Sequence, residues 1–177
     1  MMSHQDLKNY NTIRLAGVVR ESIVDGPGLR FAVFCQGCPH KCKDCHNEET
    51  HDFEGGYDCE LSKILDAVDQ NPLLDGVTFS GGEPFCQPEA FYNLAKELKN
   101  RNLNIMAYSG YTYEELLAMD NPAIKYLLSI IDILVEGRFV PEQKDLTLMF
   151  RGSTNQRIID MNLTRQKGEI VLAEKYM

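Results

Sequence analysis

The chain lacks an excess of basic residues, a long apolar run and the pattern of a secretory signal. Its 18 Lys and Arg stand against 26 Asp and Glu, a formal net charge of −8. That balance argues against a nucleic-acid backbone as the main partner, because such surfaces are basic. No run of 18 or more apolar residues predicts a membrane span. The first 17 residues contain no basic segment followed by an apolar one, so we expect no secretory signal and a cytoplasmic location.

Internal repeats, low-complexity stretches and linkers are also missing. With 177 residues, of which 44% are hydrophobic and 25% charged, the composition is that of an ordinary globular domain. We therefore expect one domain over residues 1–177. It can bury a substantial core, but it is short for a complete eight-stranded α/β barrel, which takes about 250 residues.

Apolar runs typical of strands alternate with segments of helical periodicity. We expect strands at 12–19, 30–35, 76–79, 103–108 and 131–135, and helices at 61–68, 89–100, 113–119 and 123–130. The tail from residue 151 is expected to form a loop with short strands. Strands separated by helices form right-handed β-α-β units. The sequence therefore predicts an α/β fold with a parallel sheet, whose chemistry lies at the carboxyl ends of the strands.

Six cysteines are many for a reducing compartment, where disulfide frameworks are rare. Four of them form the pattern Cys35-x2-Cys38-x3-Cys42-x2-Cys45. Zinc knuckles are normally separated by about 15 to 20 residues, which disfavours zinc here. Residues 42–46 match the haem c attachment pattern but lack its usual secretory context. A cluster bound by all four cysteines stays open as an alternative.

Cys35 differs from the other three because it ends the expected strand at 30–35. A free cysteine in such a place is commonly a small buried apolar residue. Cys38, Cys42 and Cys45 would then remain for a cluster of four irons. One iron would be open, as a catalytic metal site needs and a pure electron carrier does not.

The spacing Cys38-x3-Cys42-x2-Cys45, followed by Gly81-Gly82 after the next strand, resembles the radical S-adenosylmethionine (SAM) superfamily. The segments VDGPGLRFAVFCQGCPHKCKDCHNEETHDF, DGVTFSGGEPF and FRGSTNQRIID resemble, over nearly the whole chain, the family that activates anaerobic (class III) ribonucleoside-triphosphate reductase. The sister family, the activases of pyruvate formate-lyase, shares the DGPG and CHN elements but is longer. The resemblance implies an incomplete α/β barrel of the radical SAM type, abbreviated here, with a wide opening that the reductase would close.

The resemblance also implies the cofactors and the reaction. Cys38, Cys42 and Cys45 would bind a 4Fe-4S cluster, and SAM would bind its open iron. An electron from the cluster, supplied by reduced flavodoxin or ferredoxin, would cleave SAM to a 5'-deoxyadenosyl radical that takes hydrogen from a glycine of the reductase. The alternatives are activation of another glycyl radical enzyme, such as pyruvate formate-lyase, and a non-catalytic iron-sulfur electron-transfer module.

The positions that match the family's SAM contacts are Asp44, Cys45, His46, Gly81, Gly82, Glu83, Ser109, Glu136 and Arg138. Gly81 and Gly82 would let the backbone approach the amino end of SAM, where Glu83 offers a carboxylate to the ammonium. Asp44 and His46 would lie against the adenine. Asp44 stands where the superfamily often has an aromatic residue, so we expect a backbone contact there.

The later strand ends carry candidates with a second interpretation. Ser109, Glu136 and Arg138 would contact the ribose, the methionine carboxylate or a cation, but Glu136 and Arg138 could instead form a solvated ion pair. Residues 25–30 (DGPGLR) would line the access path for the reductase's glycine loop or form a type II turn.

Two histidines and two cysteines complete the candidates. His40 and His51 are potential ligands, but exposed loop histidines are commoner. Cys59 and Cys86 have no partner at ligand spacing. We interpret Cys59 as a bystander and Cys86 as part of a pocket wall.

Overall fold

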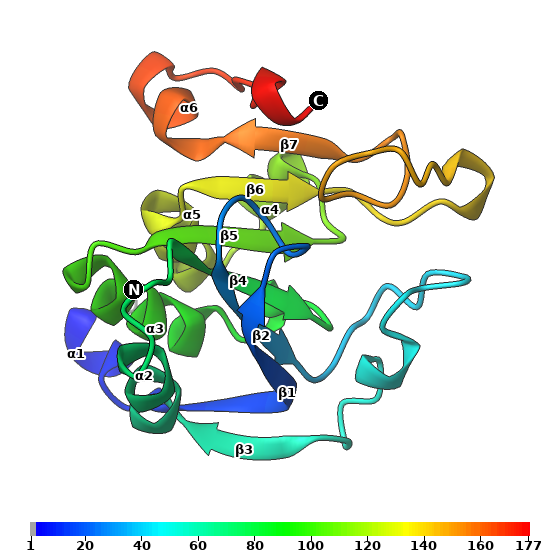
Figure 1. Ribbon diagram of the computed structural model, residues 1–177. Helices are drawn as coiled ribbons and strands as arrows, with labels where there is room; N and C mark the ends of the chain where they lie inside the picture. Colours follow the sequence, from blue (N-terminus) through cyan, green and yellow to red (C-terminus); the bar gives the residue numbers. More distant parts are fainter. Residues whose placement is uncertain (1–2) are drawn as a thin grey trace.

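The computed structural model describes residues 3–177, which form one seven-stranded sheet in the order β3-β1-β2-β4-β5-β6-β7 (Figure 1). The strands are β1 Thr12–Ser22, β2 Arg30–Cys35, β3 Tyr57–Glu60, β4 Gly76–Gly81, β5 Asn104–Ser109, β6 Ile133–Glu136 and β7 Arg157–Asp160. The central four, β2, β4, β5 and β6, pair in parallel, whereas β1, β3 and β7 are antiparallel to their neighbours. Within the described residues β3 and β7 are the two edges, so the sheet is open, as predicted for an incomplete α/β barrel.

The α-helices are α1 His4–Leu7, α2 Leu61–Asp69, α3 Pro88–Asn100, α4 Tyr113–Ala118, α5 Pro122–Ile130 and α6 Met161–Lys167. Within residues 3–177 there are also four short 3-10 helices: η1 Glu48–Thr50, η2 Pro84–Cys86, η3 Pro141–Gln143 and η4 Glu174–Tyr176. Proline occupies the first turns of α3 and α5, where its missing N–H costs nothing. No helix among residues 3–177 is long and apolar enough to cross a membrane.

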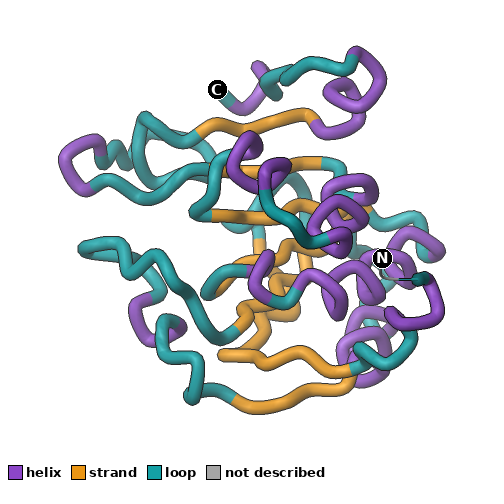
Figure 2. The backbone as a smooth tube through the Cα atoms, turned by 180° about the vertical axis from the view of Figure 1, so that it is seen from behind, coloured by secondary structure: helices purple, strands orange, loops and turns teal. Residues whose placement is uncertain are grey.

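The two faces of the sheet bury different clusters because side chains alternate along each strand. On β5, Ile105 and Ala107 join the main core against the helices, which lie in front of the strands in Figure 2. Met106 points to the other face, where it packs with Val135 and with Ala173 of the C-terminal segment. The helices therefore cover one face, and the C-terminal segment covers part of the other.

The central strands and helices agree with the sequence prediction. The strand at 30–35 has its predicted bounds, and α3 includes Pro88 as its first residue. The edge strand β3 was not predicted, because it is short and polar and pairs only with β1.

The prediction for the tail was wrong in part. The strand β7 lies there as expected, but α6 follows it directly. Asp160 caps that helix by accepting a hydrogen bond from the Leu163 N–H, and Gly168, at φ +72°, ends it. The last ten residues form a bridge between Leu172 and Ile159 and a 3-10 helix rather than strands.

Candidate active site

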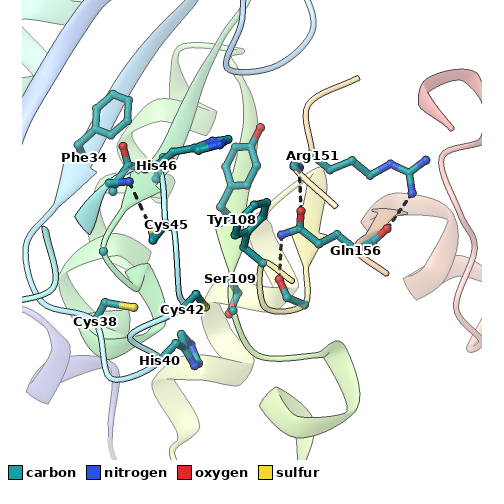
Figure 3. Close-up of a pocket in the computed structure, with 18 of the residues that line it drawn as sticks. Phe34, Cys38, His40, Cys42, Cys45, His46, Tyr108, Ser109, Arg151 and Gln156 are labelled. Atoms are coloured by element: carbon teal, nitrogen blue, oxygen red, sulfur yellow. Dashed lines mark hydrogen bonds between the residues drawn. The ribbon is translucent and has the colours of Figure 1, made fainter. Parts of the chain in front are cut away.

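A cavity of about 600 Å³ opens at the carboxyl edge of the parallel strands. Its lining comes from the loops after β2, β4, β5 and β6, which parallel pairing brings together: Cys35 is opposite Gly81, and Ser109 is opposite Glu136. Figure 3 shows part of this lining, with three cysteines on one side and residues of the late segment on the other. The convergence of loops predicted from the sequence is confirmed at this edge.

Cys38, Cys42 and Cys45 all line the cavity. They lie on a loop that we call the cysteine loop, residues 36–47. Gly37 turns the chain into this loop at φ +101°, and the Cys38 N–H donates to the His51 carbonyl at 3.1 Å. Burial raises the pKa of the Cys38 and Cys45 thiols, so binding a metal there must release protons.

The donor set of the cysteine loop fits a multi-iron cluster. All six cysteines of the chain are free. Among the described residues no three His, Cys, Asp or Glu side chains converge as ligands of a single ion would. In a four-iron cluster each thiolate binds a different iron, so the three thiols do not need to meet at one point.

Cys35 is not part of the cavity lining. Its side chain is fully buried at the end of β2, within the core that faces the helices. Burial, with the negative charge of Glu83, raises the pKa of its thiol well above the ordinary value. This placement agrees with the interpretation of Cys35 as a buried apolar residue.

Gly81 and Gly82 line the cavity beside the cysteine loop. A Cβ on Gly82 would lie 2.8 Å from the carbonyl carbon of Gly37, and a Cβ on Gly81 would lie 2.7 Å from the carbonyl carbon of Phe34. Gly81 also has φ +92°. The glycine pair is required because the end of β4 packs directly on the backbone that leads into the cysteine loop.

Glu83 lies beneath the cavity rather than in its lining, and it is 1% exposed. Its carboxylate accepts hydrogen bonds from the Phe85 N–H at 3.1 Å, the Ser109 hydroxyl at 3.0 Å and the Gly110 N–H at 2.8 Å. The Nε2 atom of His40 is 2.7 Å from its Oε2 atom. These contacts occupy both carboxylate oxygens, so contact between Glu83 and SAM stays a prediction.

The residues that flank the third cysteine differ in position. His46 lines the cavity, and the centroid of its ring lies 5.4 Å from that of the Phe139 ring. Asp44 is exposed, lies outside the lining and has φ +56°. Ser109 lines the cavity with its hydroxyl directed to Glu83.

Glu136 and Arg138 do not pair with one another. Glu136 is 1% exposed and accepts hydrogen bonds from Arg157 Nε at 2.6 Å and from the Tyr113 N–H at 2.6 Å. The hydrogen bonds to Glu136 and Glu114 raise the pKa of Arg157. Arg138 is exposed and donates from Nε to the Nδ1 atom of His40. Neither residue lines the cavity, so their roles as cofactor contacts stay predictions.

Two further expectations differ from the structure. His40 is not an exposed loop residue, because its side chain is 4% exposed. Cys86 is not among the residues that line the cavity. The residue is exposed, but desolvation of its thiol and the nearby Glu83 carboxylate raise its pKa to about 12.

Sequence reasoning assigned no role to the far wall of the cavity, residues 148–156, which we call the wall segment. Gln156 organises it: the side-chain oxygen accepts from the Gly152 N–H at 2.8 Å, and the side-chain nitrogen donates to the Gly137 carbonyl at 2.9 Å (Figure 3). The Tyr108 hydroxyl donates to the Phe150 carbonyl at 2.6 Å. Arg151 Nε is a buried donor without a partner within residues 3–177. The motif FRGSTNQRIID was the available signal for this wall.

Comparison with known proteins defines the class. The family model described as "4Fe-4S single cluster domain" matches residues 24–159. The anaerobic ribonucleoside-triphosphate reductase-activating protein of Vibrio cholerae is 35% identical over 144 residues, 77% of this chain and 90% of that protein. Its namesake from Escherichia coli K12 is 33% identical over 143 residues, 76% of this chain and 90% of that protein.

Two other similarities are more limited. The pyruvate formate-lyase-activating enzyme of Clostridium pasteurianum is 37% identical over 113 residues, 59% of this chain and 48% of that enzyme. The solved structure of QueE from Escherichia coli has a TM-score of 0.46 and 14% identity, covering 62% of this chain and 58% of that one.

The family model and the two reductase-activating relatives define an iron-sulfur protein of the activase type. The chain belongs to the family of anaerobic ribonucleoside-triphosphate reductase-activating proteins. The family resemblance carried by the cysteine, glycine and FRGSTNQRIID motifs is thereby confirmed.

Proposed function

We propose that this protein is a radical SAM activase that generates a glycyl radical on anaerobic ribonucleoside-triphosphate reductase. The observation that carries the proposal is the placement of Cys38, Cys42 and Cys45 in one cavity with the Gly81-Gly82 turn. The names of the relatives support the choice of target. The acidic chain would act in the cytoplasm.

The residues present fit both cofactors. Three free thiols and one open iron position suit a 4Fe-4S cluster, and the Gly81-Gly82 turn lines the same cavity, where the amino end of SAM would bind. When bound, the reduced cluster and SAM supply the carbon radical that removes the α-hydrogen of a glycine. The protein's part is to hold the ligands, keep the cavity polar groups fixed and exclude water. The unpartnered Arg151 Nε is a donor that the wall segment still offers.

The mouth of the cavity fits a protein partner. Ile23 is 76% exposed and Val24 73% exposed, and Val24 also lines the cavity. Leu146, next to the wall segment, is 86% exposed, and Met149, within that segment, is 56% exposed. Large apolar side chains exposed together mark interaction surfaces. We infer that the reductase covers this rim and supplies the missing wall, and that reduced flavodoxin or ferredoxin supplies the electron.

The second candidate is activation of another glycyl radical enzyme such as pyruvate formate-lyase, which the Clostridium pasteurianum relative favours. The two are separated by mixing the reduced protein and SAM with each partner in turn. The partner that acquires the glycyl radical doublet in electron paramagnetic resonance (EPR) is the target.

The decisive test uses anaerobically reconstituted protein, reduced in the presence of SAM. We expect 5'-deoxyadenosine from the wild type and from Cys59→Ala, a control on the edge strand β3, but none from Cys38→Ala. Replacement of Cys35 by Ser should leave the cluster intact. Loss of the cluster in Cys35→Ser, or absence of 5'-deoxyadenosine from the reduced wild type, would defeat the proposal and favour an electron-transfer module.

A further inference from the structure

His40 lies in the cysteine loop between the predicted ligands Cys38 and Cys42, and its ring points toward Glu83. Its Nε2 atom is 2.7 Å from Glu83 Oε2, with side-chain exposures of 4% for His40 and 0% for Glu83. A buried polar pair persists only when its hydrogen bonds are satisfied. This pair is a direct side-chain connection between the cysteine loop and the turn that follows β4.

The contact on the other side of the ring identifies which nitrogen carries the proton. Arg138 Nε donates to His40 Nδ1 at 3.2 Å, and arginine has no acceptor to offer. Nδ1 must therefore accept, and Nε2 carries the hydrogen that is donated to Glu83. Ser109 and Gly110 donate to the same carboxylate. One set of hydrogen bonds thus joins the loops that follow β2, β4, β5 and β6.

Packing fixes the orientation of the ring. A Cβ on Gly110 would lie 2.6 Å from His40 Nε2 and 2.8 Å from its Cγ atom. Gly110 is not among the residues with positive φ, so the space needed by the imidazole explains the glycine. The ring of Tyr111 meets the imidazole edge-on at 4.3 Å between centroids. Gly110 and Tyr111 therefore restrict the imidazole in addition to its two hydrogen bonds.

We propose that His40 is a positioning residue whose hydrogen bond to Glu83 fixes the cysteine loop against the Gly81-Gly82 turn. Through that bond it sets the place of the cluster ligands relative to the surface that receives the amino end of SAM. This role rests on the proposed function, and it gives Glu83 a task that requires no contact with SAM. Reacting groups must be held within a fraction of an ångström for such chemistry, which loop-to-loop bonds supply.

Two amide variants separate the hydrogen bond from other effects. In His40→Gln the side-chain nitrogen reaches the place of Nε2 and can still donate to Glu83, whereas in His40→Asn it reaches only the place of Nδ1. In the cluster-free protein we expect amide hydrogen exchange in residues 38–46 of His40→Asn to be about tenfold faster than in the wild type. The exchange rate of His40→Gln should be near that of the wild type. Gly110→Ala should accelerate exchange as His40→Asn does, because the added methyl group displaces the imidazole ring.

The loaded protein supplies a second readout. Per cluster, the KM for SAM of His40→Asn should rise about tenfold while kcat changes less, and the change in the EPR spectrum of the reduced cluster on adding SAM should require correspondingly more SAM. His40→Gln should restore both. A purely structural role would lower the yield of folded protein without moving these values.

Lys99→Met is the matched control. It removes another close side-chain contact to a buried carboxylate, the ion pair of Lys99 Nζ with Asp132 at 2.8 Å, before the amino end of β6. We expect a lower free energy of unfolding, with hydrogen exchange in residues 38–46 and the KM for SAM unchanged.

Equal behaviour of the Asn and Gln variants would overturn the proposal, and so would Lys99→Met accelerating exchange in the cysteine loop as much as His40→Asn. The exchange measurement needs neither cluster nor SAM. If the wild type failed to cleave SAM, the proposed function would fall while the assignment of His40 would still be decided by exchange.

Discussion

Replacing Arg30 with Met tests a buried cation whose hydrogen-bond acceptors are all neutral. Arg30 is 1% exposed, and its guanidinium donates to Thr78 Oγ1 at 2.7 Å, to the Val77 carbonyl at 3.0 Å, to both oxygens of Asn104 and to the Pro27 carbonyl at 3.0 Å. Burial lowers the pKa of Arg30 to about 10, so the group is charged at neutral pH. It ties the turn before β2 to β4 and β5.

The size of the effect follows from what the substitution leaves behind. Each buried acceptor that loses its donor costs about 1–3 kcal/mol. Removing the charge also relieves the burial cost that lowers the pKa of Arg30, which returns about 3 kcal/mol. We expect Arg30→Met to lower the free energy of unfolding by about 4 kcal/mol, as for other buried groups that lose one partner. Arg30→Lys keeps the charge but has fewer donors, so its free energy of unfolding should lie between those of the wild type and Arg30→Met.

The assay is urea unfolding of the cluster-free protein, followed by far-ultraviolet circular dichroism because the chain contains no Trp. Arg165→Met is the control, since Arg165 also donates to two carbonyls, those of Leu128 and Ile131, but is exposed. Arg165→Met should lower the free energy of unfolding by less than about 1 kcal/mol. A loss for Arg30→Met below about 1.5 kcal/mol, or no larger than for Arg165→Met, would refute the reasoning.

Three further predictions concern the site. Cys35→Ala should retain the wild-type iron content per chain after reconstitution, whereas Cys38→Ala should lose most of it; iron loss in both would mean that Cys35 is a ligand. Desolvation of the thiol and the nearby Glu83 carboxylate raise the pKa of Cys86 to about 12, although the residue is exposed. Its alkylation rate, followed by peptide mass spectrometry, should therefore rise tenfold per pH unit between about pH 8 and 10. A rate that levels off above about pH 9, as for an ordinary thiol, would contradict the raised pKa. Gln156→Leu should lower the free energy of unfolding by about 2 kcal/mol and speed proteolysis within the wall segment. Unchanged cleavage there would contradict the organising role of Gln156.

The sequence predicted the central β-α units because their signals are local and strong. The strand at 30–35 is apolar on both faces, as a strand covered on both sides must be. The strand β3 escaped prediction because its residues are mostly exposed and its existence depends on pairing with β1. Helix α6 carried usable signals, Asp160 as its cap and Gly168 after its end, but its apolar periodicity is too short to stand out.

The sequence predicted that the loops of the candidate site lie next to one another, but it did not predict the side-chain contacts between them. Parallel strands bring their carboxyl ends together, so the cysteine loop and the Gly81-Gly82 turn had to be neighbours. The direction of a side chain within a loop is set by tertiary packing, which no spacing pattern reports. For that reason the hydrogen bonds that join Glu83 to the loop after β5 and to His40 were not predicted.

The small number of parallel strands explains why those contacts matter. A complete barrel fixes its active-site loops by closing the ring of strands, but here the described sheet ends at β3 and β7. Side-chain hydrogen bonds between loops take over that task, through Glu83 and His40 on the cluster side and through Gln156 in the wall segment. A residue in such a site can therefore act by holding a neighbouring loop rather than by contact with a cofactor. The His40→Asn and His40→Gln pair measures how far the geometry of the cysteine loop depends on one such bond.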